Sequence, residues 1–297
     1  MNKNILTDYQ MIVPKKELEE VLTSETRKFG EEKESKKRIG RHVIMAEIKE
    51  FKEFVPIGEN ACIALGDAIT KLQTLPDKCV DLIITDPPYN LGLFMKKRGT
   101  NMNKLREGHF VASGWDDLDF NEWTRQMNIL FQECHRVLKK KGNLIMFMSI
   151  IKVETLINLG QENGFYYKTV GVWHKTNPLP RNMNLQFINS TETWIYMVND
   201  GTTGTFNNEG KAIHDFVETA TISNKERKFG KHPTQKPIGL LSHFIEILSN
   251  ENDTVLDPFM GSGSTGVSCK KLKRKFIGIE LNEKYYKLSE DRILNEI

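Results

Sequence analysis

Residues 80–90 read VDLIITDPPYN, and this stretch decides the fold. Its apolar run, residues 80–85, is typical of a buried strand. Two prolines then end the strand, because they fix φ and remove two backbone donors. Asp86, Tyr89 and Asn90 are therefore expected on a rigid turn at the carboxyl end of a strand, where open α/β sheets hold ligands and catalytic groups.

The turn suits the binding of a planar ring that carries an amino group. Tyr89 offers a stacking face, while Asp86 and the Pro87 carbonyl offer acceptors to an exocyclic NH2. A plain β-turn with a surface aspartate is the alternative that these five residues leave open.

From residue 58 onward, strand and helix patterns alternate as in an α/β domain. Strands are predicted at 61–65, 80–85, 143–148, 166–173, 193–198, 254–256 and 275–280. Helices are predicted at 67–75, 121–139, 152–163, 237–248, 264–272 and 283–297. The helix at 121–139 is expected to stop at the Lys140-Lys141-Gly142 stretch.

Residues 1–57 depart from this alternation. They are dense in Lys and Glu, whose charges nearly cancel, and they predict a charged helical N-terminal extension with helices around 15–29 and 41–54. This extension is either solvated and packed on the main domain, or it contacts DNA or forms a dimer.

Residues 176–231 depart from it as well. They lose regular periodicity and are rich in Asn, Thr and Gly, which predicts an irregular insertion rather than a core layer. Such long irregular segments are usually functional or mobile. Residues 58–175 and 232–297 are then the two halves of one α/β domain.

The composition is that of an ordinary globular protein. A chain of 297 residues can bury a large core, and its net charge of +3 is only a weak lean towards polyanions. The four cysteines form no CxxC pair and no cluster with metal-ligand spacing, so we expect no metal and free, mostly buried thiols. With no signal peptide or membrane span visible, a cytoplasmic location is predicted.

A second candidate site is the stretch DPFMGSGSTG at residues 257–266, which follows a short strand. Glycines at a strand-to-helix turn let a ligand approach the backbone. Glu280, after the next strand, is placed to accept hydrogen bonds from ribose hydroxyls. The glycine spacing alone would fit an NAD site equally well, and a P-loop is excluded because Gly-Lys-Ser/Thr is missing. Asp257 favours a ligand with a positive amino or sulfonium group.

The two sites, in this order, resemble the β class of DNA amino-methyltransferases, in which a DPPY element precedes the glycine-rich cofactor element. The stretch KHPTQKP at 231–237 resembles the segment that leads into the cofactor site of this class. Further similar stretches are GD at 66–67 with LPD at 75–77, GWD at 114–116, KTNPLPRN at 175–182 and STET at 190–193. The resemblance covers about residues 58–297. It implies a Rossmann-like S-adenosylmethionine-dependent methyltransferase fold, with a mostly parallel sheet, helices on both faces and an irregular target-recognition insertion.

The resemblance also implies roles for individual residues. The catalytic set is Asp86, Pro87, Pro88 and Tyr89. The cofactor set is Asp67, Thr234, Lys236, Asp257, Phe259, Gly261, Ser262, Gly263 and Glu280. Within it, Thr234 and Lys236 are expected to bind the cofactor carboxylate, whereas Asp67 either binds the cofactor adenine or caps the helix after it. The DNA-binding set is Lys96, Lys97, Arg98, Trp115, Arg181, Asn182 and Asn184.

The reaction implied is methyl transfer from S-adenosylmethionine to the N6 of a flipped adenine in DNA, within a restriction-modification system. Asp86 and the Pro87 carbonyl would each accept one N6 hydrogen, and Tyr89 would stack on the base. Cytosine N4 is the nearest alternative target, followed by an RNA or protein amino group, and a catalytically silent DNA-binding subunit is an alternative of another class. The expected partners are double- or single-stranded DNA, a second copy of the chain and a cognate restriction endonuclease.

Overall fold

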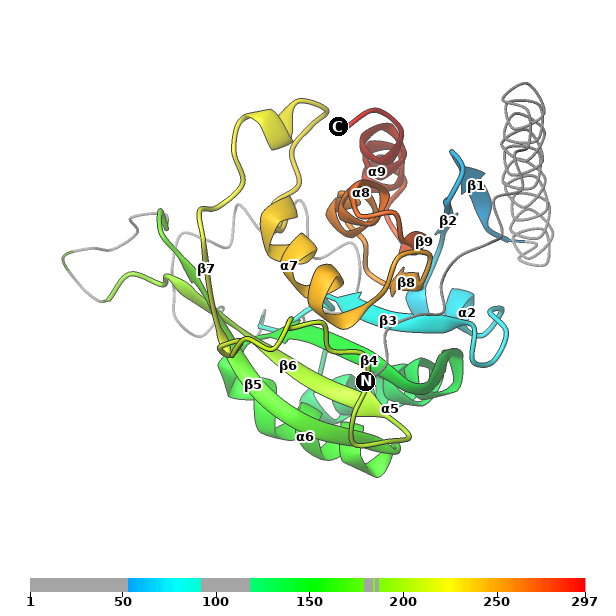
Figure 1. The fold of residues 1–297 in the computed structure, drawn as a ribbon, viewed down its shortest axis with the longest axis vertical. Coiled ribbons are helices and arrows are strands. Elements are labelled where there is room, and N and C mark those ends of the chain that lie inside the picture. Colours follow the sequence, from blue (N-terminus) through cyan, green and yellow to red (C-terminus); the bar gives the residue numbers. More distant parts are fainter. Residues whose placement is uncertain (1–52, 92–117, 179–183, 185–186, 297) are drawn as a thin grey trace, which may run out of the picture. The chain divides into compact units, whose positions relative to one another are not determined.

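The computed structural model describes residues 53–91, 118–178, 184 and 187–296, and the chain divides into the units Met1–Glu50 and Phe51–Ile297 (Figure 1). The helices predicted around 15–29 and 41–54 therefore lie outside the described residues, apart from residues 53 and 54, which are not helical.

The described residues form a nine-stranded sheet in the order β1-β2-β9-β8-β3-β4-β6-β5-β7. The strands are β1 Val55–Ile57, β2 Ala61–Leu65, β3 Val80–Thr85, β4 Leu138–Met148, β5 Phe165–Lys175, β6 Thr191–Asn199, β7 Phe216–Thr219, β8 Thr254–Asp257 and β9 Lys275–Glu280. Parallel pairing joins β2 to β9, β9 to β8, β8 to β3, β3 to β4 and β5 to β7, whereas β1–β2, β4–β6 and β6–β5 are antiparallel. The prediction of a mostly parallel sheet is confirmed.

Helices cover both faces of this sheet (Figure 1). They are α2 Ala68–Leu72, α5 Phe120–Val137, α6 Val153–Glu162, α7 Ile238–Leu248, α8 Ser264–Lys271 and α9 Glu283–Asn295, with 3-10 turns at Ile150–Lys152 and Lys225–Arg227. One face carries α7, α8 and α9, and the other carries α5 and α6. The predicted apolar stripe of α5 is buried at Trp123, Met127, Leu130 and Phe131, because residues three and four apart lie on one side of a helix.

The boundary between α5 and β4 differs from the prediction. The helix ends at Val137 and the strand begins at the next residue, Leu138, so the lysine stretch after it belongs to β4. Leu138 pairs with Val80 of β3, and Lys139 Nζ contacts both carboxylate oxygens of Asp81 at 2.8 and 2.9 Å. Pairing with a strand almost sixty residues earlier thus ends the helix, which a local pattern does not reveal.

The segment 176–231 was predicted as an irregular insertion that contains a strand at 193–198. This strand is confirmed as β6. Strand β6 lies between β4 and β5 in the sheet and buries the run from Thr193 to Asn199. Strand β7 from the same segment pairs in parallel with β5 at the sheet edge. Similarly, β1 lies within the predicted N-terminal extension but pairs with β2. Strands β7 and β1 were not predicted, because a pairing partner, rather than local composition, decides whether a short segment becomes a strand.

The cysteines are free thiols, as predicted. Cys62, Cys134 and Cys269 are buried, and Cys79 is half-buried. Among the helices in the described part of the chain, none combines the length and the apolar character that a membrane crossing requires.

Candidate active site

The DPPY turn lies where the sequence places it, directly after β3 and between β8 and β4 in the sheet. Tyr89 Oη donates to Asp86 Oδ1 at 2.7 Å. Asn90 has a positive φ of 50° and its Nδ2 donates to the Leu118 carbonyl at 3.0 Å, so it fixes the turn. Asparagine tolerates this left-handed backbone better than most residues.

Asp86 is paired with a residue from the other half of the domain. Lys236 Nζ forms an ion pair with Asp86 Oδ2, and it lies 3.1 Å from Glu192 Oε2. Glu192 Oε1 in turn accepts from Lys175 Nζ at 2.5 Å. We call Asp86, Tyr89, Lys175, Glu192 and Lys236 the acid–lysine cluster. The turn after β3, strands β5 and β6, and the segment before α7 each contribute to it.

The charges in the acid–lysine cluster shift one another's pKa values. Burial raises the pKa of the Asp86 carboxyl, with Lys236 opposing and Glu192 adding to this effect. Burial alone would also raise the pKa of Glu192, but Lys236 and Lys175 together lower it to about 2. Burial would lower the pKa of the Lys236 ammonium, yet the two carboxylates outweigh burial and raise it. Lys236 and Glu192 are therefore charged at neutral pH.

The glycine loop after β8 forms the second part of the site. Gly261 and Gly263 have positive φ values of 52° and 73°, which glycine adopts without strain. A Cβ at Gly263 would lie 2.8 Å from the Cβ of Ser289, so the close packing of α9 also requires glycine there. The Gly261 N–H donates to Glu280 Oε2 at 2.9 Å, which joins the loop to the end of β9.

Two carboxyl groups beside this loop, those of Asp257 and Glu280, have raised pKa values. Asp257 is buried and accepts from Thr265 Oγ1 at 2.6 Å and from the Phe259 N–H at 3.1 Å. Burial raises the pKa of Asp257 to about 7, and burial likewise raises that of Glu280 to about 7. A ligand that brings a positive charge or hydroxyl donors would stabilise the charged form of both carboxyl groups.

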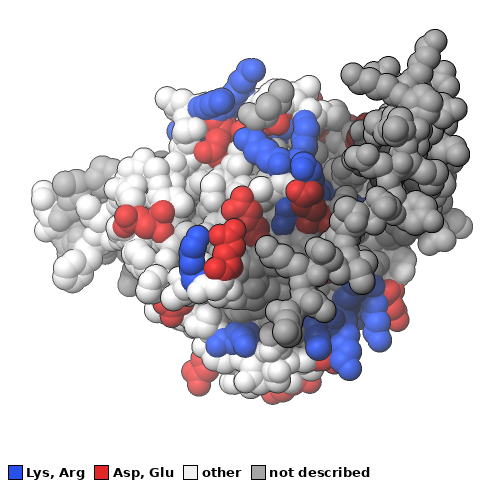
Figure 2. Space-filling view, in the orientation of Figure 1, with Lys and Arg blue, Asp and Glu red and all other residues white. Residues whose placement is uncertain are grey.

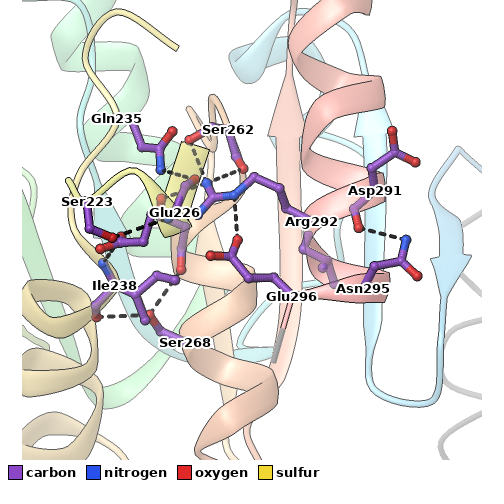
Figure 3. Close-up of polar contacts among 12 residues, drawn as sticks. Ser223, Glu226, Gln235, Ile238, Ser262, Ser268, Asp291, Arg292, Asn295 and Glu296 are labelled. Atoms are coloured by element: carbon purple, nitrogen blue, oxygen red, sulfur yellow. Dashed lines mark hydrogen bonds and ion pairs between the residues drawn. The ribbon is translucent and has the colours of Figure 1, made fainter. Parts of the chain in front are cut away.

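Arg292 of α9 holds the glycine loop from behind (Figure 3). Its Nη1 donates to the Ser262 carbonyl at 2.8 Å, to Ser262 Oγ at 2.9 Å and to Ser264 Oγ at 3.0 Å. Its Nε donates to Glu296 Oε2 at 2.7 Å. This residue was not predicted as part of the site, although a signal exists: Arg292 falls in the buried stripe of α9 with Tyr285, Leu288 and Ser289.

The segment that carries Lys236 is fixed by a residue from the preceding loop (Figure 3). Glu226 Oε2 accepts from the Ile238 N–H at 3.0 Å at the start of α7, and the Glu226 carbonyl accepts from Gln235 Nε2 at 3.1 Å. His232 packs edge-on against Tyr285 with ring centroids 4.3 Å apart. These contacts hold residues 232–237 beside both the DPPY turn and the glycine loop.

Three more residues of the predicted cofactor set are Asp67, Thr234 and Lys236. Asp67 caps α2, because its Oδ1 accepts from the Thr70 N–H and from Thr70 Oγ1, both at 2.9 Å. Thr234 is exposed. The Lys236 ammonium forms ion pairs with Asp86 and Glu192, so it is already paired with two carboxylates of the chain itself.

Most of the predicted DNA-binding residues lie outside the described residues. These are Lys96, Lys97, Arg98, Trp115, Arg181 and Asn182. Asn184 is described and exposed. On the face shown in Figure 2, basic and acidic side chains lie among one another, so charge alone indicates no DNA-binding surface on the described part of that face.

Glu192 and Lys175 are functional candidates that the sequence analysis did not assign. Glu192 lies in a stretch that resembles the methyltransferase class, but its neighbours in sequence do not indicate a contact with Asp86, 106 residues earlier. Only the pairing of β5 with β6 and of β6 with β4 brings Lys175 and Glu192 towards the DPPY turn.

Solved DNA methyltransferases share this fold. The SAM complex of M1.HpyAVI is 28% identical with a TM-score of 0.58, and the similarity covers 78% of this chain and 99% of that one. The cytosine-N4-specific PvuII DNA methyltransferase has a TM-score of 0.64 at 20% identity, covering 82% and 92% of the two chains, which concerns the fold alone. The fold and the two adjoining sites therefore define a Rossmann-like methyltransferase.

Sequence relatives identify the family. The family described as DNA methylase, N6_N4_Mtase, matches residues 80–291. The type II methyltransferase M.HinfI of Haemophilus influenzae is 34% identical over 78% of this chain and 67% of its own length. M2.LlaDCHI of Lactococcus lactis subsp. cremoris is 33% identical over 79% and 90% of the two chains. The chain belongs to the DNA methylase family.

Proposed function

We propose that this DNA methyltransferase transfers a methyl group from S-adenosylmethionine to the exocyclic N6 of adenine. The observation that carries the proposal is the pairing of β3 with β8, which joins Leu82 to Val255 and Ile83 to Leu256. The DPPY turn and the glycine loop follow these two strands at the same edge of the sheet. An acceptor for an amino group is thus adjacent to a loop suited to a nucleoside cofactor.

The residues of the glycine loop fit S-adenosylmethionine. Asp257 is a buried carboxylate with only two donors to it among the described residues, and burial raises its pKa to about 7, so a positive group nearby would stabilise its charge. Glu280 ends β9 as an acceptor for ribose hydroxyls, and Gly261, Ser262 and Gly263 let the ligand approach the backbone. When bound, the cofactor supplies an electrophilic methyl group on its sulfonium.

The chain's own residues orient the amine for this transfer. The N6 lone pair is delocalised into the adenine ring, so positioning matters more than a strong base. Asp86 and the Pro87 carbonyl each accept one N6 hydrogen, which draws the nitrogen towards sp3 geometry. Tyr89 stacks on the flipped base. Asp86 then takes up or passes on the proton that the methylated amine releases.

Adenine is preferred to cytosine on the identity of one residue. Both exocyclic amino groups undergo the same chemistry. In the methyltransferase class that this chain resembles, an aspartate at the first position of the motif favours adenine, whereas a serine favours cytosine. The position is Asp86 in this chain. The relatives are named type II methyltransferases, which supports a place in a restriction-modification system with a cognate endonuclease.

The remaining parts of the chain have proposed roles of their own. The segment 176–231 reads the target sequence through Arg181, Asn182 and Asn184, and Lys96, Lys97 and Arg98 contact the DNA backbone. Trp115 lines the pocket for the base.

The test is methyl transfer from labelled S-adenosylmethionine to unmethylated genomic DNA, followed by mass spectrometry of the nucleosides. We expect N6-methyladenine with the wild type, and a loss of at least about 100-fold with Asp86→Ala, within the range that positioned acid–base groups supply. Asp77→Ala, which removes an exposed carboxylate paired with Arg136, is the matched control. N4-methylcytosine would overturn the base assignment, and no methylation of any DNA would overturn the proposed function.

A further inference from the structure

Both oxygens of the Asp86 carboxylate are engaged by donors of the chain itself. Tyr89 Oη donates to Oδ1 at 2.7 Å, and Lys236 Nζ is paired with Oδ2. A target amino group must therefore compete with at least one of these donors before Asp86 accepts its hydrogen. A displaced donor also needs a new acceptor, because an unpaired buried ammonium or hydroxyl is costly.

Glu192 is such an acceptor for either donor. Its Oε2 lies 3.1 Å from Lys236 Nζ and 3.5 Å from Tyr89 Oη. Its other oxygen is held by Lys175 Nζ at 2.5 Å, which fixes the carboxylate in place. A small displacement is thus enough for Lys236 or Tyr89 to change its acceptor from Asp86 to Glu192.

The charges support this exchange. Lys236 and Lys175 lower the pKa of Glu192 to about 2, so that it is a charged acceptor at neutral pH. Burial raises the pKa of Tyr89 well above its ordinary value, so its hydroxyl remains a donor. Lys236 Nζ also lies 5.1 Å from the ring centroid of Phe147 and 5.9 Å from that of Tyr89.

We propose that Glu192 is a positioning residue that takes up Lys236, or Tyr89, when the target amino group displaces it from Asp86. The inference rests on the proposed function. In the free protein Lys236 is paired with Asp86. In the DNA complex the lysine is paired with Glu192, so that one oxygen of Asp86 accepts an N6 hydrogen. No proton moves in the exchange, and the two carboxylates and two ammonium groups of the acid–lysine cluster keep their total charge.

The test compares single-turnover methyl transfer by wild type, Glu192→Gln and Glu192→Asp, with labelled S-adenosylmethionine bound before unmethylated genomic DNA is added. Glutamine keeps the shape of the side chain but removes its charge. We expect its rate to fall about 10- to 100-fold, as for the loss of a hydrogen bond to a charged group. Aspartate keeps the charge on a shorter side chain, so its rate should lie between the other two. Cofactor affinity, measured by calorimetry, should stay within about threefold, because a factor of three is less than 1 kcal/mol.

Glu251→Gln is the matched control, since this glutamate forms an exposed pair with Lys273 at 3.3 Å. It should leave the rate unchanged. A wild-type rate in Glu192→Gln would overturn the inference, as would a loss of rate explained entirely by weaker cofactor binding. If the glutamine variant does not fold, the aspartate variant decides: a slower rate supports the exchange, and a wild-type rate overturns it. Failure of the wild type to methylate DNA would instead overturn the proposed function.

Discussion

Replacing Arg292 by methionine should weaken both the fold and the cofactor loop. Arg292 is fully buried, and its contacts join α9 to the glycine loop through Ser262 and Ser264 and to Glu296 at the C-cap of the helix. Methionine has a similar length and fills much of the same space. It leaves the Glu296 carboxylate, which is 8% exposed, without its cation.

The magnitude follows from the buried pair. Removing one partner of a buried ion pair costs roughly 3–5 kcal/mol, because the other charge stays buried without compensation. The hydrogen bonds to the loop are part of this loss and are not added to it. For a chain of this size, 1 kcal/mol corresponds to roughly 2–4 °C in the melting temperature. The unfolding midpoint should therefore fall by roughly 6–20 °C.

The assay is thermal unfolding with and without S-adenosylmethionine, combined with calorimetry of cofactor binding. Arg292→Met should also weaken cofactor affinity, since Ser262 loses its anchor. The double variant Arg292→Met, Glu296→Leu should recover part of the stability, because replacing both partners of a buried pair with apolar groups is often nearly neutral. Lys287→Met, at an exposed position of the same helix, is the control. An unfolding midpoint and a cofactor affinity both equal to those of the wild type would refute the reasoning.

Two further predictions follow from the cofactor site. Burial raises the pKa of Asp257 and Glu280 to about 7, so the folded protein binds protons more tightly at these groups than the unfolded chain does. The stability of the free protein should therefore fall as pH rises from about 4 to 7, and it should then level off. Melting temperatures between pH 5 and 8 measure this, and an equal slope in Asp257→Asn would contradict it. Asp67→Ala should cost about 1 kcal/mol through the lost cap of α2, and Asp67→Ser should restore the cap. The resemblance also implies that Asp67 binds the cofactor adenine, and on that role the serine variant should still bind the cofactor more weakly. Wild-type cofactor affinity in the serine variant would reduce Asp67 to a cap.

Strands that depend on their own residues were predicted closely. The bounds of β2, β3 and β9 agree with the sequence analysis, because short apolar runs bounded by turn residues are typical of strands buried in a parallel sheet. The end of α5 was wrong by two residues, and β1 and β7 were missed. These errors share one cause, which is that pairing with another strand orders each segment. Strand β1 pairs with the adjacent β2, whereas β4 and β7 pair with strands distant in sequence.

The candidate site divides in the same way. The motifs around Asp86 and Asp257 were recognisable from local sequence, since each consists of a strand followed by a turn with a defined residue pattern. The partners of those residues were not. Lys236 reaches Asp86 across 150 residues, and Glu192 reaches Tyr89 across 103. The glycine loop likewise depends on Arg292, 30 residues after Ser262.

The sequence by itself determined the α/β class and the two strand-end motifs, because apolar periodicity and turn chemistry act over a few neighbouring residues. Only the tertiary structure decided which charges meet. The sheet order places β3 between β8 and β4 and brings β6 beside β4, which gathers Asp86, Glu192 and Lys236 at one edge. The shifted pKa values arise from this gathering and from burial, since the strength of a charge interaction depends on distance and on the exclusion of water.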